Sequence, residues 1–508
     1  MSGWEGKESR HGQVRYPARL PLNHSVGHTH PNSIRAASSL ILMAGWAVLG
    51  LLFVAFSIAL TAASPLFGYG YEVADMPVFA LVAGLVLAGI VFCVALPPLI
   101  AKSLMAEAAT VRIFTATIIV VGLAARLVLF ASEPILEDDY QRYLWDGAVT
   151  MSGEDPYAAS PQSARQPNAP NALARLAEAA GPVAERINHP ELKTIYPPVA
   201  QAAFALAHIL KPWSLIAWRT VLLICDIATL SLILLLLGET GRSPLWSALY
   251  WWNPLVIKEL FNSAHMDAVV LPLVLFALLL VARGRQVIAS TGLAVATGAK
   301  IWPVLLLPLV LRPLVTQKRK LAVAIMIFCG LILLWATPIL LSGLDANSGL
   351  TAYLAYWKTN SALFPAIECA LATFLNAFDL TGLPAGRVAR VLIALALGGL
   401  AFVLSYRPLK NADDLMGRAS FLVAALVLLS PAQFPWYGTW FAPFLAFRPW
   451  FGFLLLTATA PLYYMYFHFA SAGEPEVFRQ YVVWLIWVPV WAALIFEVAL
   501  HQRAERSI

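Results

Sequence analysis

Apolar segments long enough to cross a lipid bilayer recur along this chain from residue 38 to residue 500. A membrane-spanning helix needs about 20 consecutive apolar residues. Of the 508 residues, 60% are hydrophobic and only 12% are charged. A water-soluble fold would need a hydrophobic core far larger than single domains contain. The chain is therefore predicted to be an all-α polytopic integral membrane protein.

The distribution of basic residues predicts the orientation of the chain. Lys and Arg cluster in short loops between the apolar segments, as in "RGR" (283–285) and "RPLVTQKRK" (312–320). This is the positive-inside bias of membrane proteins, so the net charge of +6 indicates contact with membrane lipids and no nucleic acid partner. We expect a multi-pass protein of the cell inner (plasma) membrane with both termini in the cytoplasm.

The two ends of the chain are predicted to be cytoplasmic tails, at residues 1–37 and 501–508. The apolar segment after residue 37 is too long for a cleavable signal peptide and lacks a convincing cleavage site. The tail histidines are interpreted as solvated residues of a disordered segment rather than metal ligands: His11, His24, His28 and His30. The cysteines show no C-x-x-C spacing and lie in apolar segments, which excludes a disulfide framework or a metal cage: Cys93, Cys225, Cys329 and Cys369.

A long polar loop interrupts the apolar segments early in the chain. Residues 38–109 hold two N-terminal membrane helices, and a third is predicted at 110–131. The loop that follows, 132–196, is rich in Pro, Ala and Asn, and helices are expected near 138–151 and 171–186. The charge bias places this loop outside the cytoplasm, and long ordered loops usually carry function.

The apolar segments beyond this loop are shorter and irregular. If both basic loops of this region are cytoplasmic, residues 287–314 must form two half-helices that turn near Lys300. This arrangement brings "NSAHMD" (262–267) and "GAKIWP" (298–303) to the outer face. Breaks in helices at membrane depth are tolerated where protein or a water-filled cavity surrounds them. Residues 346–500 are predicted to form C-terminal membrane helices and outer loops.

The densest group of charges lies in the stretch "EPILEDDYQRYLWDG" (133–147). In a helix that begins near Asp138, Arg142 is spaced to reach the carboxylates of Asp138, Asp139 and Asp146. A helix cap with a salt-bridge ladder is the structural alternative, and it stays open for Asp146. Two adjacent acids repel each other, which raises one pKa and suits a general base near neutral pH.

Four further ionisable side chains lie within or beside apolar segments: Lys258, His265, Asp267 and Lys300. Each would cost about 2.5–3.5 kcal/mol at the bilayer centre, so a polar cavity is expected around them. Structural ion pairs, Lys258 with Glu259 or His265 with Asp226, are the alternative for each. Together the four residues predict a site in which cations that bind an anion face a carboxylate base.

An ordered set of motifs resembles a known family. The motifs are "DDYQRYLWDG" (138–147), "DPYAASP" (155–161), "TIYPPVAQ" (194–201), "NSAHMDA" (262–268) and "GAKIWP" (298–303). In this order they resemble the GT-C-fold glycosyltransferases that use polyprenyl-phosphate sugars, and among them the bacterial membrane α-mannosyltransferases. The resemblance covers roughly residues 110–345. It implies a GT-C-like bundle of about 11 to 14 transmembrane or partial helices, with 110–345 as the catalytic module.

The resemblance also implies a reaction and a role for each residue. In this branch of the family the implied sugar is mannose, which passes with inversion from a polyprenyl-phosphate donor to a lipid or glycan acceptor at the extracytoplasmic face. Asp139, with Asp138 beside it, is implied as the catalytic base. Cationic residues would stabilise the donor phosphate: Lys300, His265, Arg142 and Lys358. Polar and aromatic residues would bind sugar or acceptor: Tyr143, Trp145, Asp146, Tyr157, Tyr196 and Asp267.

Several questions stay open at this point. No cofactor is expected, and although a divalent metal is conceivable, the sequence offers no dedicated ligand set. The sugar, the acceptor, the choice between Asp138 and Asp139, and the oligomeric state are not specified. A transporter or flippase of lipid-linked saccharides is the main alternative, since broken helices and buried charges suit it as well. A scaffold subunit is a third reading, but it leaves the Asp138 and Asp139 pair without a role.

Overall fold

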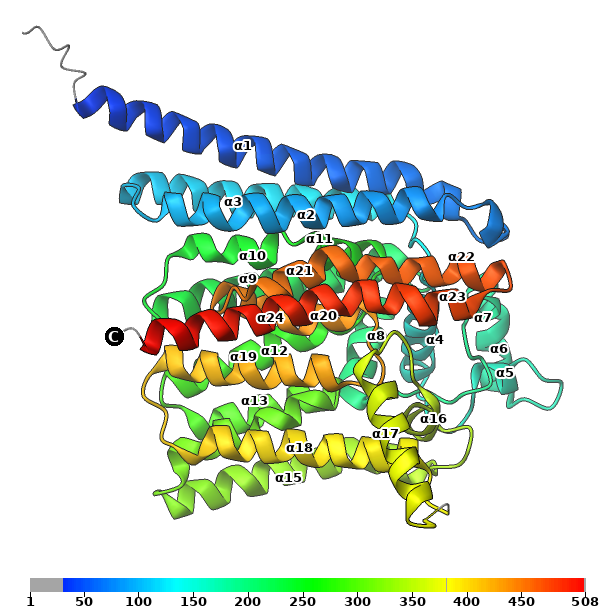
Figure 1. Ribbon diagram of the computed structural model, residues 1–508. Helices are drawn as coiled ribbons and strands as arrows, with labels where there is room; N and C mark the ends of the chain where they lie inside the picture. Colours follow the sequence, from blue (N-terminus) through cyan, green and yellow to red (C-terminus); the bar gives the residue numbers. More distant parts are fainter. Residues whose placement is uncertain (1–30, 381, 507–508) are drawn as a thin grey trace, which may run out of the picture. The chain divides into compact units, whose positions relative to one another are not determined.

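The computed structural model describes residues 31–380 and 382–506, and within these ranges the fold is all-helical, as predicted (Figure 1). The described residues form no strand, only one isolated bridge between Thr359 and Ala432. The chain divides into two compact units, residues 1–41 and 42–508. The first unit is described from Pro31, where helix α1 (Pro31–Ala63) begins, so the tail histidines lie outside the described residues.

Seven of the described helices are long and apolar enough to cross a membrane. They are Leu40–Phe67 (most of α1 with η1), α2 (Val78–Ser103), Ala108–Ala131 (α3, Ala108–Val128, with η3), α9 (Leu215–Glu239), α15 (Lys318–Leu341), α18 (Ala385–Tyr406) and Pro475–Leu500 (α23 to α24, the latter Val483–Arg506). In α15 only 11% of the most apolar stretch is buried. An exposed apolar surface of this extent is typical of a helix that faces lipid.

Shorter helices occupy the region where the sequence predicts half-helices. Helix α12 (Asp267–Ala282) is followed by α13 (Gln286–Ala299), and the chain turns at Lys300 before the helical segment η6 to η7 (Trp302–Leu314). Helix α13 packs against both α12 and α15. The predicted turn near Lys300 is therefore confirmed, and it places Lys300 beside the start of α12.

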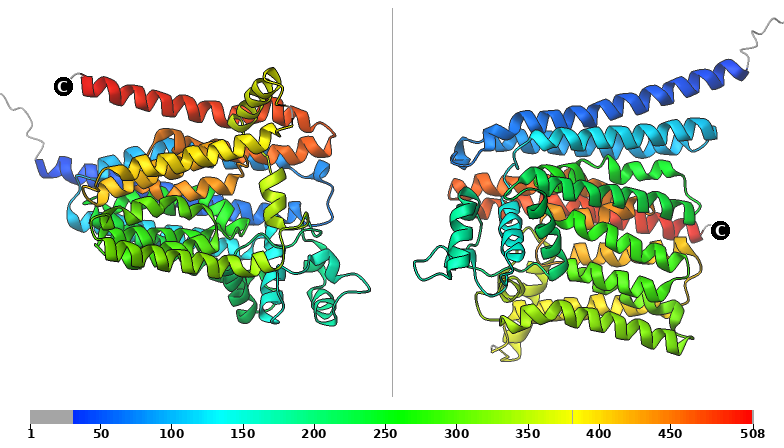
Figure 2. Two further views of the ribbon diagram at one scale, coloured as in Figure 1. Left: turned by 90° about the horizontal axis from the view of Figure 1, so that it is seen from below. Right: turned by 180° about the vertical axis from the view of Figure 1, so that it is seen from behind.

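The long loop folds into short helices at one end of the second unit. These include α4 (Asp139–Met151), α6 (Asn171–Ala180) and α7 (Pro182–Glu185), close to the two helices predicted there. Gly181, with a φ of +50°, separates α6 from α7. Both views of Figure 2 keep this segment at the end opposite the last described turn of α24. Away from this segment, Arg242 and Arg448 both pair with Asp413.

Gly147 allows α4 to pack closely against α8 (Pro198–Leu210). A Cβ atom at this position would lie 2.4 Å from the carbonyl oxygen of Phe204. A backbone atom cannot move aside as the end of a flexible side chain can. Gly147→Ala is therefore expected to destabilise the fold by about 1–3 kcal/mol. Thermal unfolding in detergent measures this. Gly330→Ala is the control, since no atom lies within 4 Å of its added Cβ, and equal effects of both variants would contradict the prediction.

A buried ion pair joins α3 to α9. The Nε atom of Arg126 lies 2.5 Å from Oδ2 of Asp226, and both side chains are fully buried. Tyr250 donates a short hydrogen bond to the other oxygen of Asp226, and Arg126 also donates to the carbonyl of Trp251 at 2.8 Å. The predicted alternative in which Asp226 pairs with His265 is therefore wrong.

Candidate functional site

The acidic doublet lies at the start of α4. Asp138 is the residue before the helix and Asp139 is its first residue. The side-chain amide of Asn188 donates to Oδ1 of Asp138 at 2.7 Å and to Oδ1 of Asp139 at 2.9 Å. Carboxylates are favoured at helix N-termini, where free backbone N–H groups and the helix dipole stabilise negative charge. Asn188 thus holds the two acids together at the end of the molecule.

Arg142 does not reach this doublet. Its Nε donates to Oδ1 of Asp146 at 2.9 Å, and its Nη1 donates to the carbonyl of Leu192 at 3.0 Å. Asp146 also accepts from Thr194 at 2.5 Å and from Gln201 at 3.1 Å. The prediction that one guanidinium contacts three carboxylates is wrong, because Arg142 and Asp146 instead fasten the segment of residues 192–201 to α4. This supports the structural reading of Asp146.

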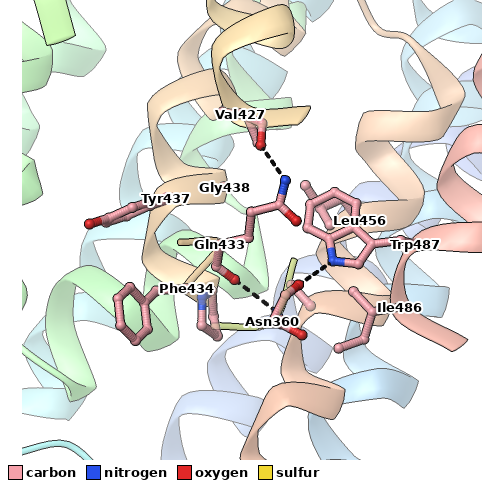
Figure 3. A pocket seen from close by; sticks show the side chains of 11 residues that line it. Asn360, Val427, Gln433, Phe434, Tyr437, Gly438, Leu456, Ile486 and Trp487 are labelled. Carbon is pink, nitrogen blue, oxygen red and sulfur yellow. Dashed lines mark hydrogen bonds between the residues drawn. The ribbon is translucent and has the colours of Figure 1, made fainter. Parts of the chain in front are cut away.

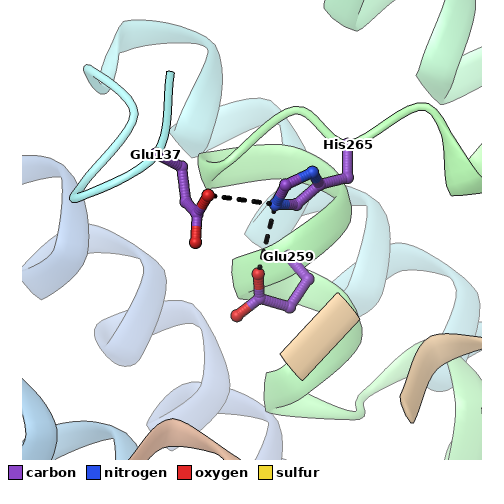
Figure 4. Close-up of side chains that lie close together, drawn as sticks. All are labelled: Glu137, Glu259 and His265. Carbon is purple, nitrogen blue, oxygen red and sulfur yellow. Dashed lines mark ion pairs between the residues drawn. The ribbon is translucent and has the colours of Figure 1, made fainter. Parts of the chain in front are cut away.

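A buried imidazole, that of His265, lies beside the carboxylates of Glu137 and Glu259 (Figure 4) and near Asp139 of the doublet. His265 follows the π-helical segment η5 (Ile257–Asn262). Its Nε2 lies 3.6 Å from Oε2 of Glu137 and 3.7 Å from Oε2 of Glu259, and its Nδ1 lies 3.7 Å from Oδ2 of Asp139. We call Glu137, Asp139, Glu259 and His265 the carboxylate–histidine cluster. The ring of Trp436 stacks on His265 with 3.9 Å between centroids.

Lys258 is fully buried and lies next to Glu259 of this cluster. Its Nζ donates to Tyr464 at 2.7 Å, to Ser263 at 2.7 Å and to the carbonyl of Ile135 at 3.2 Å. The hydroxyl of Tyr464 donates in turn to Glu259. Lys258 and Glu259 are 4.0 Å apart, so the predicted structural pair of these two residues is confirmed.

Lys300 and Asp267 form a second charged group. The Nζ of Lys300 lies 2.6 Å from Oδ1 of Asp267, which also accepts a short hydrogen bond from the indole of Trp440. Asp267 is buried, whereas 22% of the Lys300 side chain is exposed. Lys300 lies 4.9 Å from the ring centroids of Tyr437 and Trp440. A cation that is fixed by a carboxylate and yet accessible can meet an anionic ligand.

Of the predicted aromatic residues, Tyr143 contacts Asp139 of the doublet and Tyr196 packs against Tyr143. The hydroxyl of Tyr143 donates to Oδ2 of Asp139 at 3.4 Å, and its ring is 5.2 Å from that of Tyr196. Tyr157 donates to the carbonyl of Tyr196 at 2.9 Å.

The remaining predicted residues have other surroundings. Trp145 packs into a separate apolar cluster of the loop, with Val149, Leu173 and Ile187. Lys358 is paired with both carboxylate oxygens of Glu368 at 2.9 Å. The structure therefore does not bring Trp145 or Lys358 to the carboxylate–histidine cluster.

Two comparisons with known proteins bear on this site. Residues 126–316 match the MptA_B family, described as alpha-(1->6)-mannopyranosyltransferase, N-terminal domain. Alpha-(1->6)-mannopyranosyltransferase A of Mycobacterium tuberculosis (strain ATCC 25618 / H37Rv) is 23% identical over 334 residues, which are 61% of this chain and 61% of that protein. Over these regions the chain is similar to alpha-(1->6)-mannopyranosyltransferases. The aligned region thus spans less than two thirds of that relative's length, and no solved structure matches the chain.

The comparisons confirm the resemblance that the motifs indicate. The family match includes the doublet, His265, Asp267 and Lys300. It ends before residues 436–440, whose aromatic side chains cover His265 and Lys300. The charged half of the site therefore lies in the region shared with mannosyltransferases, and the aromatic half lies outside it.

Several residues of the site were not singled out from the sequence. Glu137 lies in the charged stretch of residues 133–147 without a role of its own, and Glu259 is expected only as a structural partner of Lys258. Trp436 and Trp440 lie in the short helices η8 (Pro435–Tyr437) and α20 (Gly438–Phe441) that follow α19 (Ala412–Leu429), and only the aromatic content of this segment sets it apart. Asn188 follows α7 without any pattern that marks it. Their contacts depend on segments far apart in the chain, so composition alone gives no signal for them.

A small pocket lies beside this aromatic turn (Figure 3). Asn360, Gln433, Phe434, Tyr437 and Trp487 are among its lining residues. Asn360 donates to the carbonyl of Gln433 at 2.8 Å and accepts from the indole of Trp487 at 2.6 Å through its own carbonyl. These bonds join the loop before α17 (Leu363–Ala377) to the turn that carries Tyr437, and thereby position the aromatic residues near Lys300.

The environment raises the pKa of each acid at the start of α4. Burial is the main cause for Glu137, whose pKa is held well above its usual range although Lys258 acts in the opposite direction. Burial and then the charge of Asp139 raise the pKa of Asp138 to about 6, against the hydrogen bond from Asn188. Burial also raises the pKa of Asp139, against Asn188 and Lys300. Carboxylates with raised pKa values are suited to accept protons near neutral pH.

Proposed function

We propose that this chain transfers a mannosyl group, with inversion, from a polyprenyl-phosphate donor to a lipid or glycan acceptor. The observation that carries the proposal is the half-buried carboxylate of Asp139, which faces His265 within reach of the Lys300 charge. These residues lie within the region that matches the mannosyltransferase family. The choice of mannose rests on the names of that family and of the mycobacterial relative. The choice of a polyprenyl-phosphate donor rests on the resemblance of the motifs.

The proposed reaction assigns a task to each part of the site. Asp139 takes the proton from the acceptor hydroxyl, whose oxygen attacks C1 of the mannosyl group. The bond from C1 to the phosphate oxygen breaks, and its electron pair leaves with the polyprenyl phosphate. Lys300, which is partly exposed, would stabilise the growing phosphate charge. Tyr143 and Tyr196 would contact the sugar and the acceptor beside Asp139.

We further propose that the site opens to the extracytoplasmic face of the plasma membrane. The start of α4 lies at the opposite end from the described end of α24 (Figure 1). Basic residues 242 and 448 gather around Asp413, apart from the α4 end. The positive-inside bias assigns such basic loops to the cytoplasm. Shorter helices such as α12 and α13 would cross the bilayer in part, giving about 11 to 14 full or partial spans in all.

The test uses the purified full chain in liposomes. Radiolabelled polyprenyl-phosphate mannose, polyprenyl-phosphate glucose and a nucleotide-activated mannose are each supplied with membrane lipids and lipoglycans as acceptors. We expect label to pass from polyprenyl-phosphate mannose into a product that an α-mannosidase can release. Transfer from the nucleotide sugar alone would overturn the donor class. Movement of the lipid-linked sugar between leaflets without transfer would support a transporter instead.

The pH dependence of transfer follows from the raised pKa values of the doublet. A base must be deprotonated to act, so the rate falls as the pH is lowered through the pKa of the doublet. With Asp138 at about 6 and Asp139 also raised, activity should decline well above the ordinary aspartate value of 3.8. Initial rates between about pH 4.5 and 8 measure this. A rate that stays constant down to about pH 4.5 would contradict it.

A further inference from the structure

His265 is buried without a hydrogen-bond partner. The residue is fully buried, yet neither ring nitrogen has a hydrogen-bonding partner among the described residues. Oε1 of Glu137 is also buried and unpartnered. Buried polar groups are almost always satisfied, and an exception in a polar cluster calls for an unseen partner. Here the Nε2 atom faces the carboxylates of Glu137 and Glu259 (Figure 4).

The distances from His265 in this group are too long for hydrogen bonds and lie close to the spacing of two ligands around one ion. Nε2 lies 3.6 Å from Oε2 of Glu137 and 3.7 Å from Oε2 of Glu259, beyond the usual range of N–H···O bonds. Metal bonds from imidazole and carboxylate are about 2.0–2.2 Å long, so two ligands of one ion lie about 3–3.6 Å apart. One ligand atom from each of the three residues lies within 4.8 Å of the others. Small side-chain movements would bring all three to a common ion.

The charge around the imidazole also favours a cation. Three carboxylates, Glu137, Glu259 and Asp139, lie within 4 Å of the ring. Lys258 is the one buried cation beside Glu259 among the described residues, and it is engaged by Tyr464, Ser263 and Ile135. A buried excess of negative charge is costly unless a cation or a proton neutralises it.

We propose that Glu137, Glu259 and His265 bind a divalent transition-metal ion. One imidazole with two carboxylates suits Mn²⁺ or Zn²⁺ better than Mg²⁺ or Ca²⁺, which prefer oxygen ligands alone. This departs from the expectation of no metal, because the sequence separates Glu137 from the other two ligands. The inference does not rest on the proposed function, since the site is defined by its ligands.

Such an ion would link the site to Asp139. With the metal on Nε2, the other ring nitrogen carries the proton and points to Oδ2 of Asp139, 3.7 Å away. Metal-bound histidines generally donate their second N–H to a carboxylate, which sets the tautomer and the ring orientation. The ion would thereby hold Asp139 in place and connect the start of α4 to η5.

The test measures bound metal on the purified full chain, without any sugar donor. The protein is stripped with a chelator and titrated with Mn²⁺ or Zn²⁺, and bound metal is counted by elemental mass spectrometry. We expect about one ion per chain, with ¹⁴N coupling from the imidazole in pulsed EPR of the Mn²⁺ form. Glu137→Gln, Glu259→Gln and His265→Gln should each weaken binding at least about tenfold.

A matched control distinguishes binding at this site from non-specific metal binding by exposed carboxylates. Glu133→Gln changes an exposed acid in the same loop and should bind metal like the wild type. Size-exclusion profiles check folding, and Glu137→Gln removes no hydrogen bond made by the side chain within the described residues. Wild type that binds no more metal than Glu137→Gln, or Mn²⁺ without ¹⁴N coupling, would overturn the proposal. The cluster would then be neutralised by protons, and the proposed transfer reaction would be unaffected.

Discussion

Replacing Asp139 with Asn is expected to lower the rate of mannosyl transfer by about 10² to 10⁴, the usual contribution of a general base. Asn has nearly the same size, and its oxygen can still accept the hydrogen bond from Asn188. What it loses is the ability to take the proton from the acceptor hydroxyl. Initial rates at saturating donor measure the loss, which should appear in the turnover number more than in the KM for donor.

Two further variants make this prediction specific. Asp138→Asn removes the adjacent acid, which Asn188 also binds, and should retain more activity than Asp139→Asn. Asp75→Asn changes an exposed acid in the turn between α1 and α2 and should behave like the wild type. If Asp138→Asn is the inactive variant and Asp139→Asn is active, Asp138 is the base. If both variants keep full activity, the base mechanism is wrong.

The helices of this protein could be predicted because their causes are local. Apolar length predicts the third membrane helix at 110–131, where the structure has Ala108–Ala131. The positions of basic loops predict the turn at Lys300, because only a pair of half-helices keeps both flanking basic loops on one side. These signals depend on neighbours in the chain, so no knowledge of tertiary contacts is needed.

The partners of the charged side chains could not be predicted in this way. Helical spacing allows Arg142 to reach Asp138, Asp139 or Asp146 equally well. The choice of Asp146 depends on the carbonyl of Leu192 and on Thr194, which lie on a segment that folds back over α4. The same is true of His265, whose neighbours come from three separate parts of the chain.

Removal of the buried carboxylate that joins α3 to α9 should destabilise the fold more than any surface change. Asp226→Asn is expected to lower the free energy of unfolding by about 3–5 kcal/mol, because it leaves the buried guanidinium of Arg126 without a counter-charge. The free energy of unfolding in detergent, from a denaturant titration, measures this effect. The control is Glu239→Gln on the same helix, whose partly exposed pair with Arg283 should contribute about 0–1 kcal/mol.

A double variant separates the charge from the contact. Arg126→Met with Asp226→Leu removes both charges and fills similar space, and replacements of this kind are often neutral or stabilising. It should therefore recover most of the stability lost in Asp226→Asn, except for the cost of leaving the Tyr250 hydroxyl without its acceptor. If Asp226→Asn costs no more than Glu239→Gln, the pair is not needed to neutralise charge. If the double variant is no better than Asp226→Asn, the stability comes from the geometry of the pair, through which Arg126 also binds the carbonyl of Trp251.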